Sequence, residues 1–215
     1  QSGKTTSLHL DTMDLRSDGL GAPMIIGLSG NVNGNAFQAK GELGPLDLLL
    51  KGGKPYPVAL NIVAPGVTVD VQGAIAEPRK ARGINLILSV DGKDLAATAK
   101  AAGVTVAKIP PVTLSGVLSD PKGGYQLDNL DVKIGGSDLK GKVMVKMAGA
   151  RPSLIVALTS SLLDLDALLP KSSSKPAAQK DKKRVFPSDP LAVDGLKAVD
   201  ASISIKAKRI VTGGM

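Results

Sequence analysis

The amino-acid sequence predicts a mostly β protein, an extended and curved antiparallel sheet with a few short helices. Three observations lead to this prediction. Apolar and polar residues alternate in period two through much of residues 23–165, the pattern of strands that have one apolar face. Glycine and proline number 25 and 14 of 215 residues, which suits frequent turns. Hydrophobic residues make up 43% of the chain and are mainly aliphatic, so they can build a packed interior.

Roughly eleven strands are expected, from residues 8–10 near the start to residues 203–205 near the end. The turns between them are recognisable. Asn33-Gly34 favours a tight hairpin, residues 64–66 contain Pro-Gly, and residues 120–124 form a longer turn rich in glycine. Short turns of this kind predict that neighbouring strands run antiparallel.

Short helices are expected to interrupt the strands. Residues 94–102 are rich in alanine, and Gly103 follows them. Residues 190–199 begin with proline after Asp189, a favourable N-cap. Two shorter helices are predicted at residues 46–50 and 162–169.

The net charge of +8 is concentrated in one segment. Residues 170–184 carry +5, which leaves +3 on the other 200 residues. This segment lacks an apolar period and predicts a flexible basic loop, either simply solvated or in contact with anionic lipid head groups. The folded part is therefore nearly neutral. With four aromatic residues in the chain, Phe37, Tyr56, Tyr125 and Phe186, it also lacks the stacking platforms of nucleic-acid binding, so no nucleic-acid partner is expected.

Sequence motifs for catalysis are weak. Gly3-Lys4-Thr5 is similar to the end of a phosphate-binding loop, but the residues that follow continue a strand, so a hairpin turn is predicted instead. His9 is the single histidine and is expected to be a solvent-facing strand residue. The chain has no cysteine, which excludes disulfides and thiolate chemistry and is compatible with the periplasm. We therefore expect no metal and no cofactor.

Paired carboxylates were the remaining candidates for acid–base chemistry. Asp164 and Asp166 lie where capping of a helix explains them, and Asp128 and Asp131 lack a basic partner nearby in sequence. The sequence therefore predicts a non-catalytic protein. No stretch reaches the ~18 apolar residues of a membrane-spanning helix, and no signal peptide opens the chain.

Five passages, taken in order along nearly the whole chain, resemble the AsmA family of bacterial envelope proteins. They are Gly41-Glu42-Leu43-Gly44-Pro45-Leu46 with Gly52-Gly53-x-Pro55; Gly92-x-Asp94-Leu95-Ala96 leading to Leu114-Ser115-Gly116; Gly136-Ser137-Asp138-Leu139-x-Gly141; Leu163-Asp164-Leu165-Asp166-x-Leu168-Leu169; and Val185-Phe186-Pro187-Ser188-Asp189-Pro190-Leu191 with Leu196-Lys197-Ala198-x-Asp200-Ala201.

The resemblance implies a part of a longer protein. Residues 1–215 would be a single β-groove domain fragment, with residues 170–184 as a loop within it. The family resemblance further implies an N-terminal inner-membrane anchor missing from this chain, a periplasmic location in a Gram-negative bacterium, and a role in phospholipid transport between inner and outer membranes and in envelope homeostasis. It supplies no catalytic residues.

The alternating strands allow the same function on physical grounds. Keeping a ~16-carbon acyl chain out of water requires apolar surface worth about 12 kcal/mol, at about 0.8 kcal/mol per CH₂. The residues expected to line such a groove and bind phospholipid or another acyl-chain lipid are Leu60, Ile62, Val69, Val71, Leu86, Leu88, Leu114, Val132, Val143, Val145, Val156 and Leu158.

Two alternatives stay open from the sequence. The same apolar stripe could form the core of a closed sandwich, because the pattern alone favours neither arrangement. The protein could also be a periplasmic structural or assembly factor for outer-membrane proteins that binds envelope proteins through sheet edges. The alternation does not say which face is concave, and an error of one residue in register would exchange the two faces.

Overall fold

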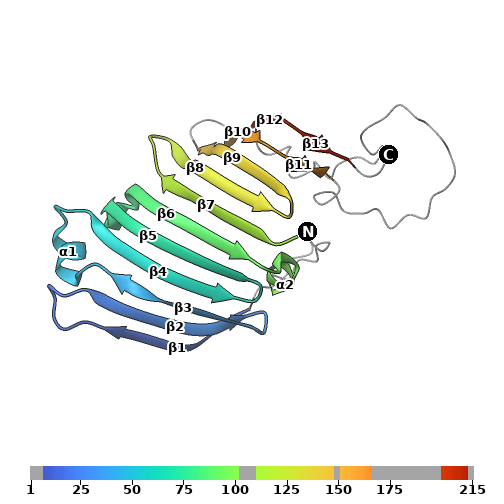
Figure 1. The fold of residues 1–215 in the computed structure, drawn as a ribbon. Coiled ribbons are helices and arrows are strands. Elements are labelled where there is room, and N and C mark those ends of the chain that lie inside the picture. Colours follow the sequence, from blue (N-terminus) through green and yellow to red (C-terminus); the bar gives the residue numbers. More distant parts are fainter. Residues whose placement is uncertain (1–6, 102–109, 148–150, 166–199, 213–215) are drawn as a thin grey trace.

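The computed structural model describes residues 7–101, 110–147, 151–165 and 200–212. Most of these residues belong to one large sheet (Figure 1). Its eleven strands are β1 (Leu8–Arg16), β2 (Met24–Val32), β3 (Asn35–Leu43), β4 (Tyr56–Ala64), β5 (Val67–Glu77), β6 (Arg82–Gly92), β7 (Val112–Ser119), β8 (Gly124–Ile134), β9 (Ser137–Lys146), β10 (Ser153–Ser160) and β12 (Asp200–Ala207). A second, two-stranded sheet contains β11 (Leu163–Asp164) and β13 (Ile210–Val211). The predicted fold class, a mostly β antiparallel sheet with few helices, is confirmed.

From β1 to β10, each strand pairs with the next one along the chain, always antiparallel. The predicted turns lie at these connections. At the β2–β3 hairpin Asn33 and Gly34 have φ of 51° and 77°, the pair of positive values that a type I′ turn requires. Gly66 has φ of 77° in the β4–β5 turn, and the Gly124 amide donates to the Pro121 carbonyl in the β7–β8 turn.

The expectation that all neighbouring strands are antiparallel is wrong at the end of the sheet. β12 lies beside β10 and runs parallel to it, from Ser153 opposite Asp200 to Ser160 opposite Ala207. The small β11–β13 sheet is also parallel. A parallel neighbour requires a long connection, and the sequence between β11 and β12 is long enough to provide one.

Two predicted helices are confirmed. They are α1 (Leu46–Lys51) and α2 (Leu95–Ala101), at opposite ends of the strands (Figure 1). Asp94 caps α2, since its carboxylate accepts a hydrogen bond from the Ala97 amide at 3.0 Å. A short 3-10 turn, η1 (Pro78–Lys80), lies near α1, since the Arg79 guanidinium donates a hydrogen bond to the Leu50 carbonyl at 3.4 Å. The helix predicted at residues 162–169 is wrong at its start, where Leu163 and Asp164 form β11. The helix predicted at residues 190–199 and the basic loop at 170–184 lie outside the described residues.

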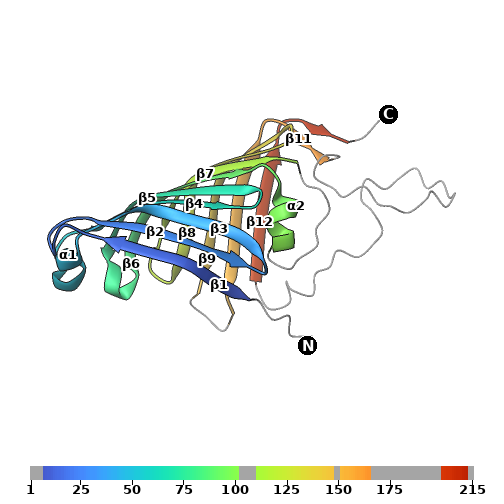
Figure 2. The same cartoon turned by 90° about the horizontal axis from the view of Figure 1, so that it is seen from below.

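The large sheet is strongly bent and twisted, so that β1–β3 cross in front of β8, β9 and β12 when the molecule is viewed from below (Figure 2). Irregularities in the ladders contribute to the bend. Pairing shifts by a residue in β1 after Leu10, in the β7–β8 ladder after Ser115, and in β8 after Leu127. Bulges of this kind increase local twist and curvature. The sheet stays open, with β1 and β12 as its two edge strands among the described residues.

Candidate functional site

The registers of the sheet place the predicted groove residues on one face. Residues that lie directly opposite each other in a ladder project to the same side. Leu60 lies opposite Val71, and Val71 lies opposite Leu88. Across the next ladder, Val90 lies opposite Leu114. Since Leu88 and Val90 are two positions apart in β6, the first half of the predicted set shares a face.

The second half follows from the remaining ladders. Leu114 lies opposite Val132 in β8, and Val132 lies opposite Leu139 in β9. Val143, four positions further in the same strand, lies opposite Val156 in β10. The structure therefore brings all twelve predicted residues together on a single side of the sheet. We call this side the apolar face.

The apolar face extends beyond the twelve predicted residues. It includes aliphatic and aromatic residues of both flanking regions, which were not among the predicted twelve. Those of β2, β3 and β12 follow the same alternation, whereas the phase in β1 changes at the bulge after Leu10. On the β1–β3 side they include Leu8, Leu10, Met13, Leu15, Ile26, Leu28 and Phe37, and on the β12 side they are Ile203 and Ile205. Ten spacings of about 4.8 Å between eleven strands give this face a contour of about 48 Å across the sheet.

Burial identifies the apolar face as the inside of the bend. Leu86, on the apolar face, is 9% exposed, whereas its neighbour Ile87, on the other face of the same strand, is 57% exposed. Side chains converge on the inside of a curved sheet and diverge on the outside. All five buried hydrophobic residues of the described chain lie on the apolar face, and most of its exposed members, such as Leu8 and Ile203, lie on the edge strands. Burial therefore places the apolar face on the concave side over the central strands, a point that the sequence left open.

The apolar face is shielded but not sealed. Among the described residues, no side chain is less than 2% exposed, and the buried hydrophobic residues are Met24, Tyr56, Leu86, Leu130 and Val132. The other predicted groove residues have intermediate exposure. A closed sandwich of this size would bury a whole layer of inward side chains completely. The described strands form one layer, which favours the open groove over the sandwich.

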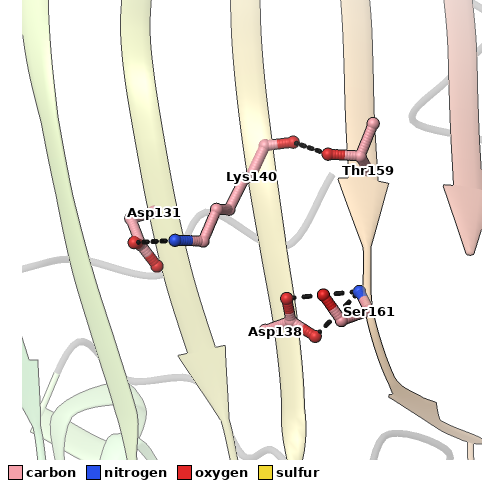
Figure 3. Close-up of polar contacts among 5 residues, drawn as sticks. All are labelled: Asp131, Asp138, Lys140, Thr159 and Ser161. Carbon is pink, nitrogen blue, oxygen red and sulfur yellow. Dashed lines mark hydrogen bonds and ion pairs between the residues drawn. The ribbon is translucent and has the colours of Figure 1, made fainter. Parts of the chain in front are cut away.

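The outer face is polar, and side-chain hydrogen bonds connect neighbouring strands across it. Asn61 donates to the Asp70 carboxylate at 2.8 Å across the β4–β5 ladder. The Lys140 ammonium lies 2.8 Å from the Asp131 carboxylate across β8–β9 (Figure 3). This hydrogen bond, and then the charge of Asp131, raise the pKa of Lys140. Asp131 thus has the basic partner that was not apparent from its sequence neighbours.

A second polar cluster fixes the chain where it leaves β10. The Asp138 carboxylate accepts a hydrogen bond from the backbone amide of Ser161 at 3.0 Å (Figure 3). It also accepts one from the backbone amide of Leu162 at 2.8 Å. These two amides lower the pKa of Asp138, with the Leu162 amide contributing most. The Ser137 hydroxyl accepts from the Asp164 amide at 2.9 Å. Asp164 therefore ends a strand held to β9 and directly precedes Leu165, which is helical, so it lies at the strand-to-helix junction predicted for it.

At the opposite end of the strands, Tyr56 closes one corner of the apolar face. Its hydroxyl donates to the Gly44 carbonyl at 2.8 Å, and burial raises the pKa of Tyr56. A Cβ on Gly44 would lie 2.8 Å from the Tyr56 ring, so glycine is needed for this close approach. The buried Tyr56 side chain therefore holds the start of β4 against the end of β3, beside α1.

The described ranges contain no group of three His, Asp or Glu side chains that could hold a metal ion. His9 is a solvent-exposed residue of β1, as predicted, and lies 3.4 Å from Asp11. Gly3, Lys4 and Thr5 lie outside the described residues. No helix in the described part of the chain is long and apolar enough to cross a bilayer.

These features define a class of protein: an open, single-layer, bent β-sheet with a polar convex face and a continuous apolar concave face. A comparison with curated proteins is more specific. The AsmA family protein YhjG of Escherichia coli (strain K12) is 25% identical to this chain over 206 residues, covering 86% of this chain. This match supports the chain's membership of the AsmA family. The chain spans 30% of the length of that relative. No family model and no solved structure matches the chain.

Proposed function

We propose that this chain is a section of a lipid-binding groove that takes part in phospholipid transport between the inner and outer membranes and in envelope homeostasis. The observation that supports this proposal is the unbroken apolar face on the inside of the bent sheet. Acyl chains would lie on this face while head groups remain in water. In the proposed setting the chain is the periplasmic part of an anchored envelope protein, and transfer requires no bond chemistry.

The energetics favour hydrocarbon as the occupant. Withdrawing a ~16-carbon chain from water yields about 12 kcal/mol when every CH₂ is covered. The contour of about 48 Å exceeds the ~30 Å hydrocarbon thickness of a whole bilayer, so the face offers room for complete acyl chains. Side chains of intermediate exposure supply the contact surface, because they are accessible enough to be covered further.

Photo-crosslinking tests this proposal with adjacent positions on opposite faces. A photoreactive amino acid replaces Leu88 or Leu158 on the apolar face, and the matched controls replace Ser89 or Thr159 on the outer face. In cells, the first pair should capture phospholipid several-fold more efficiently than the second. Equal capture at both faces would contradict a groove, since the two positions of each pair differ mainly in the side of the sheet they occupy.

A structural or assembly role is the second candidate, and the edge strands favour it. β1 and β12 are the edges of the described sheet, and their apolar side chains, such as Met13 and Ile203, are exposed. Exposed edges allow strand addition by an envelope protein. Photoreactive groups at these edges that capture protein, together with an apolar face that captures no lipid, would favour this second role.

A further inference from the structure

The ends of the strands form two borders of the sheet that differ in charge. One border contains α1 and the connections β1–β2, β3–β4, β5–β6, β7–β8 and β9–β10; we call it the α1 border. The other contains α2 and the connections β2–β3, β4–β5, β6–β7 and β8–β9; we call it the α2 border (Figure 1). Every described connection on the α1 border carries at least one Lys or Arg, counting the terminal residues of the strands.

The two borders are not equally basic. Along the α1 border, nine basic and five acidic residues are described: Arg16, Lys51, Lys54, Arg79, Lys80, Arg82, Lys122, Lys146 and Arg151 against Asp18, Asp47, Glu77, Asp120 and Asp200. On the α2 border, the turns β2–β3, β4–β5 and β8–β9 carry no charged residue. Its described charges lie beside α2, in β11 and after β12, and are four basic and two acidic residues: Lys93, Lys100, Lys208 and Arg209 against Asp94 and Asp164. Positive charge therefore recurs beside the apolar face along one border.

One part of the α1 border is a pocket of about 360 Å³ between η1 and the β7–β8 turn. Its lining includes three basic side chains, Lys80, Arg82 and Lys122, and one acidic side chain, Asp120. Tyr125 and Met147, both exposed, complete it. Tyr125 lies opposite Val145 in the β8–β9 ladder and so belongs to the apolar face. The pocket thus joins the apolar face to a cluster of cations.

Backbone hydrogen bonds hold the pocket in shape. The Asp120 carboxylate accepts from the amides of Gly83, at 2.9 Å, and Ile84, which ties the start of β6 to the β7–β8 turn. The Met147 amide donates to the Gly123 carbonyl at 2.6 Å and closes the far side. Asp120 is thereby engaged with backbone donors rather than with a basic side chain.

Two of the three cations, Arg82 and Lys122, lie outside the ion pairs of the described residues, although, after the hydrogen bond and charge of Lys80, the charge of Arg82 also contributes to lowering the pKa of Glu77. The Lys80 ammonium lies 2.7 Å from the Glu77 carboxylate. Glu77 is also the residue directly opposite Arg82 in the β5–β6 ladder. Arg82 and Lys122 form no ion pair within the described part of the chain. The lining therefore has a net positive charge and two groups suited to phosphate oxygens.

We propose that this pocket binds the phosphate of an anionic glycerophospholipid whose acyl chains lie on the apolar face, so that the groove favours net-negative lipids over zwitterionic ones. This proposal rests on the proposed lipid-binding function and adds the head-group class. A net-positive pocket attracts a lipid of charge −1 more than a neutral zwitterion. Tyr125 and Met147 would pack on the glycerol region between phosphate and tails.

The test uses the full chain and native mass spectrometry with an equimolar mixture of phosphatidylglycerol and phosphatidylcholine that carry identical acyl chains. The wild-type chain should retain phosphatidylglycerol about fivefold or more over phosphatidylcholine, from about a fivefold effect for each basic residue near the head group. The variant Arg82→Gln/Lys122→Gln should lose this preference and still retain both lipids. The matched control Lys93→Gln/Lys100→Gln removes the same charge from the α2 border and should keep the preference.

The outcomes separate the two proposals. Retention of both lipids without preference by the wild type, or an unchanged preference in Arg82→Gln/Lys122→Gln, would overturn the head-group assignment and leave the groove intact. Retention of neither lipid would refute the groove and the head-group site together. In a further arm, sn-glycerol 3-phosphate is added in excess. If it binds as tightly as the intact lipid, the pocket is a site for free phosphate esters and the lipid assignment fails.

Discussion

Gly141 provides a sharp test of how the bend in the sheet is built. It lies in β9 on the apolar face, opposite Leu158 in β10 and Leu130 in β8. Its φ is +151°, a conformation that residues with a side chain rarely adopt. A Cβ at this position would lie 2.1 Å from the Ala157 carbonyl oxygen, far inside contact distance, and the obstructing atom is backbone. Gly141→Ala should therefore distort the β9–β10 ladder.

Two terms contribute to the expected loss of stability. Holding alanine at a sparsely populated φ costs about 1–3 kcal/mol. Moving the β10 backbone to admit a methyl group adds about 1–3 kcal/mol, the usual cost of overpacking. We expect Gly141→Ala to lower the free energy of unfolding by about 3 kcal/mol. The matched control is Gly27→Ala in β2, where the nearest atom to the added Cβ is the Asp14 Cβ at 3.8 Å. This control should change stability by less than about 0.5 kcal/mol.

Urea denaturation of the full chain, followed by circular dichroism, measures both variants. The linear dependence of unfolding free energy on urea gives the difference directly, provided that the slope is unchanged. If Gly141→Ala cannot be purified folded, Gly73→Ala replaces it, because Gly73 has φ of +145° and a Cβ there would lie 2.2 Å from the Asn85 carbonyl. Equal stability of the Gly141→Ala and Gly27→Ala variants would refute the idea that only glycine fits at position 141 without loss of stability.

Three further predictions concern the anchors of the fold. Tyr56→Phe removes the buried hydrogen bond to a backbone carbonyl and should lower the unfolding free energy by about 1–2 kcal/mol in the same denaturation assay. Leu86→Ala should cost about 2 kcal/mol and Ile87→Ala less than about 1 kcal/mol, because their exposures are 9% and 57%; similar losses would mean that the two faces are equally buried. Asp138 has a lowered pKa, so its carboxylate stabilises the fold above the pKa it has in the unfolded chain, and that contribution disappears as pH falls through the lower, folded-state pKa. Asp138→Asn should weaken this acid dependence of the melting temperature. An unchanged pH profile would show that the hydrogen bonds from the two backbone amides stabilise the fold equally well without the negative charge of the carboxylate.

The period-two alternation predicted the strands and the shared face because it depends on local geometry alone. Leu60, Val71 and Leu88 were assigned to one face from alternation, and each ladder confirms the assignment. The alternation fails where the ladder is irregular. Leu127 and Leu130 are three positions apart in β8, yet both pair with residues on the apolar face of β9, because a bulge lies between them. A sequence pattern does not locate such bulges, and each one changes the phase of the residues beyond it.

Strand partners and directions depend on contacts that a local pattern does not encode. β12 alternates as β10 does, with Ile203 and Ile205 on its apolar side, and this pattern is the same for a parallel or an antiparallel neighbour. Hairpin turns determine direction elsewhere in the sheet. No short turn links β10 to β12, so the sequence held no indication of their parallel pairing. The ion pair of Asp131 with Lys140 was missed for the same reason, since its partner lies on the adjacent strand.

The choice between a closed core and an open face also lies beyond alternation, because both arrangements need the same apolar residues. Exposure separates them, since a covered face would contain side chains shut off from solvent completely. Curvature explains how an uncovered face can persist in water. On the inside of the bend each side chain is shielded by its neighbours in adjacent strands, which lowers the apolar area in contact with water without a second layer. The same bend leaves these side chains reachable from the open side and brings the cations of the α1 border beside them. If glycines such as Gly73 and Gly141 permit the bend, then the same few backbone positions have two effects. They allow the sheet to shield its apolar face in the absence of lipid, and they leave that face open to a lipid.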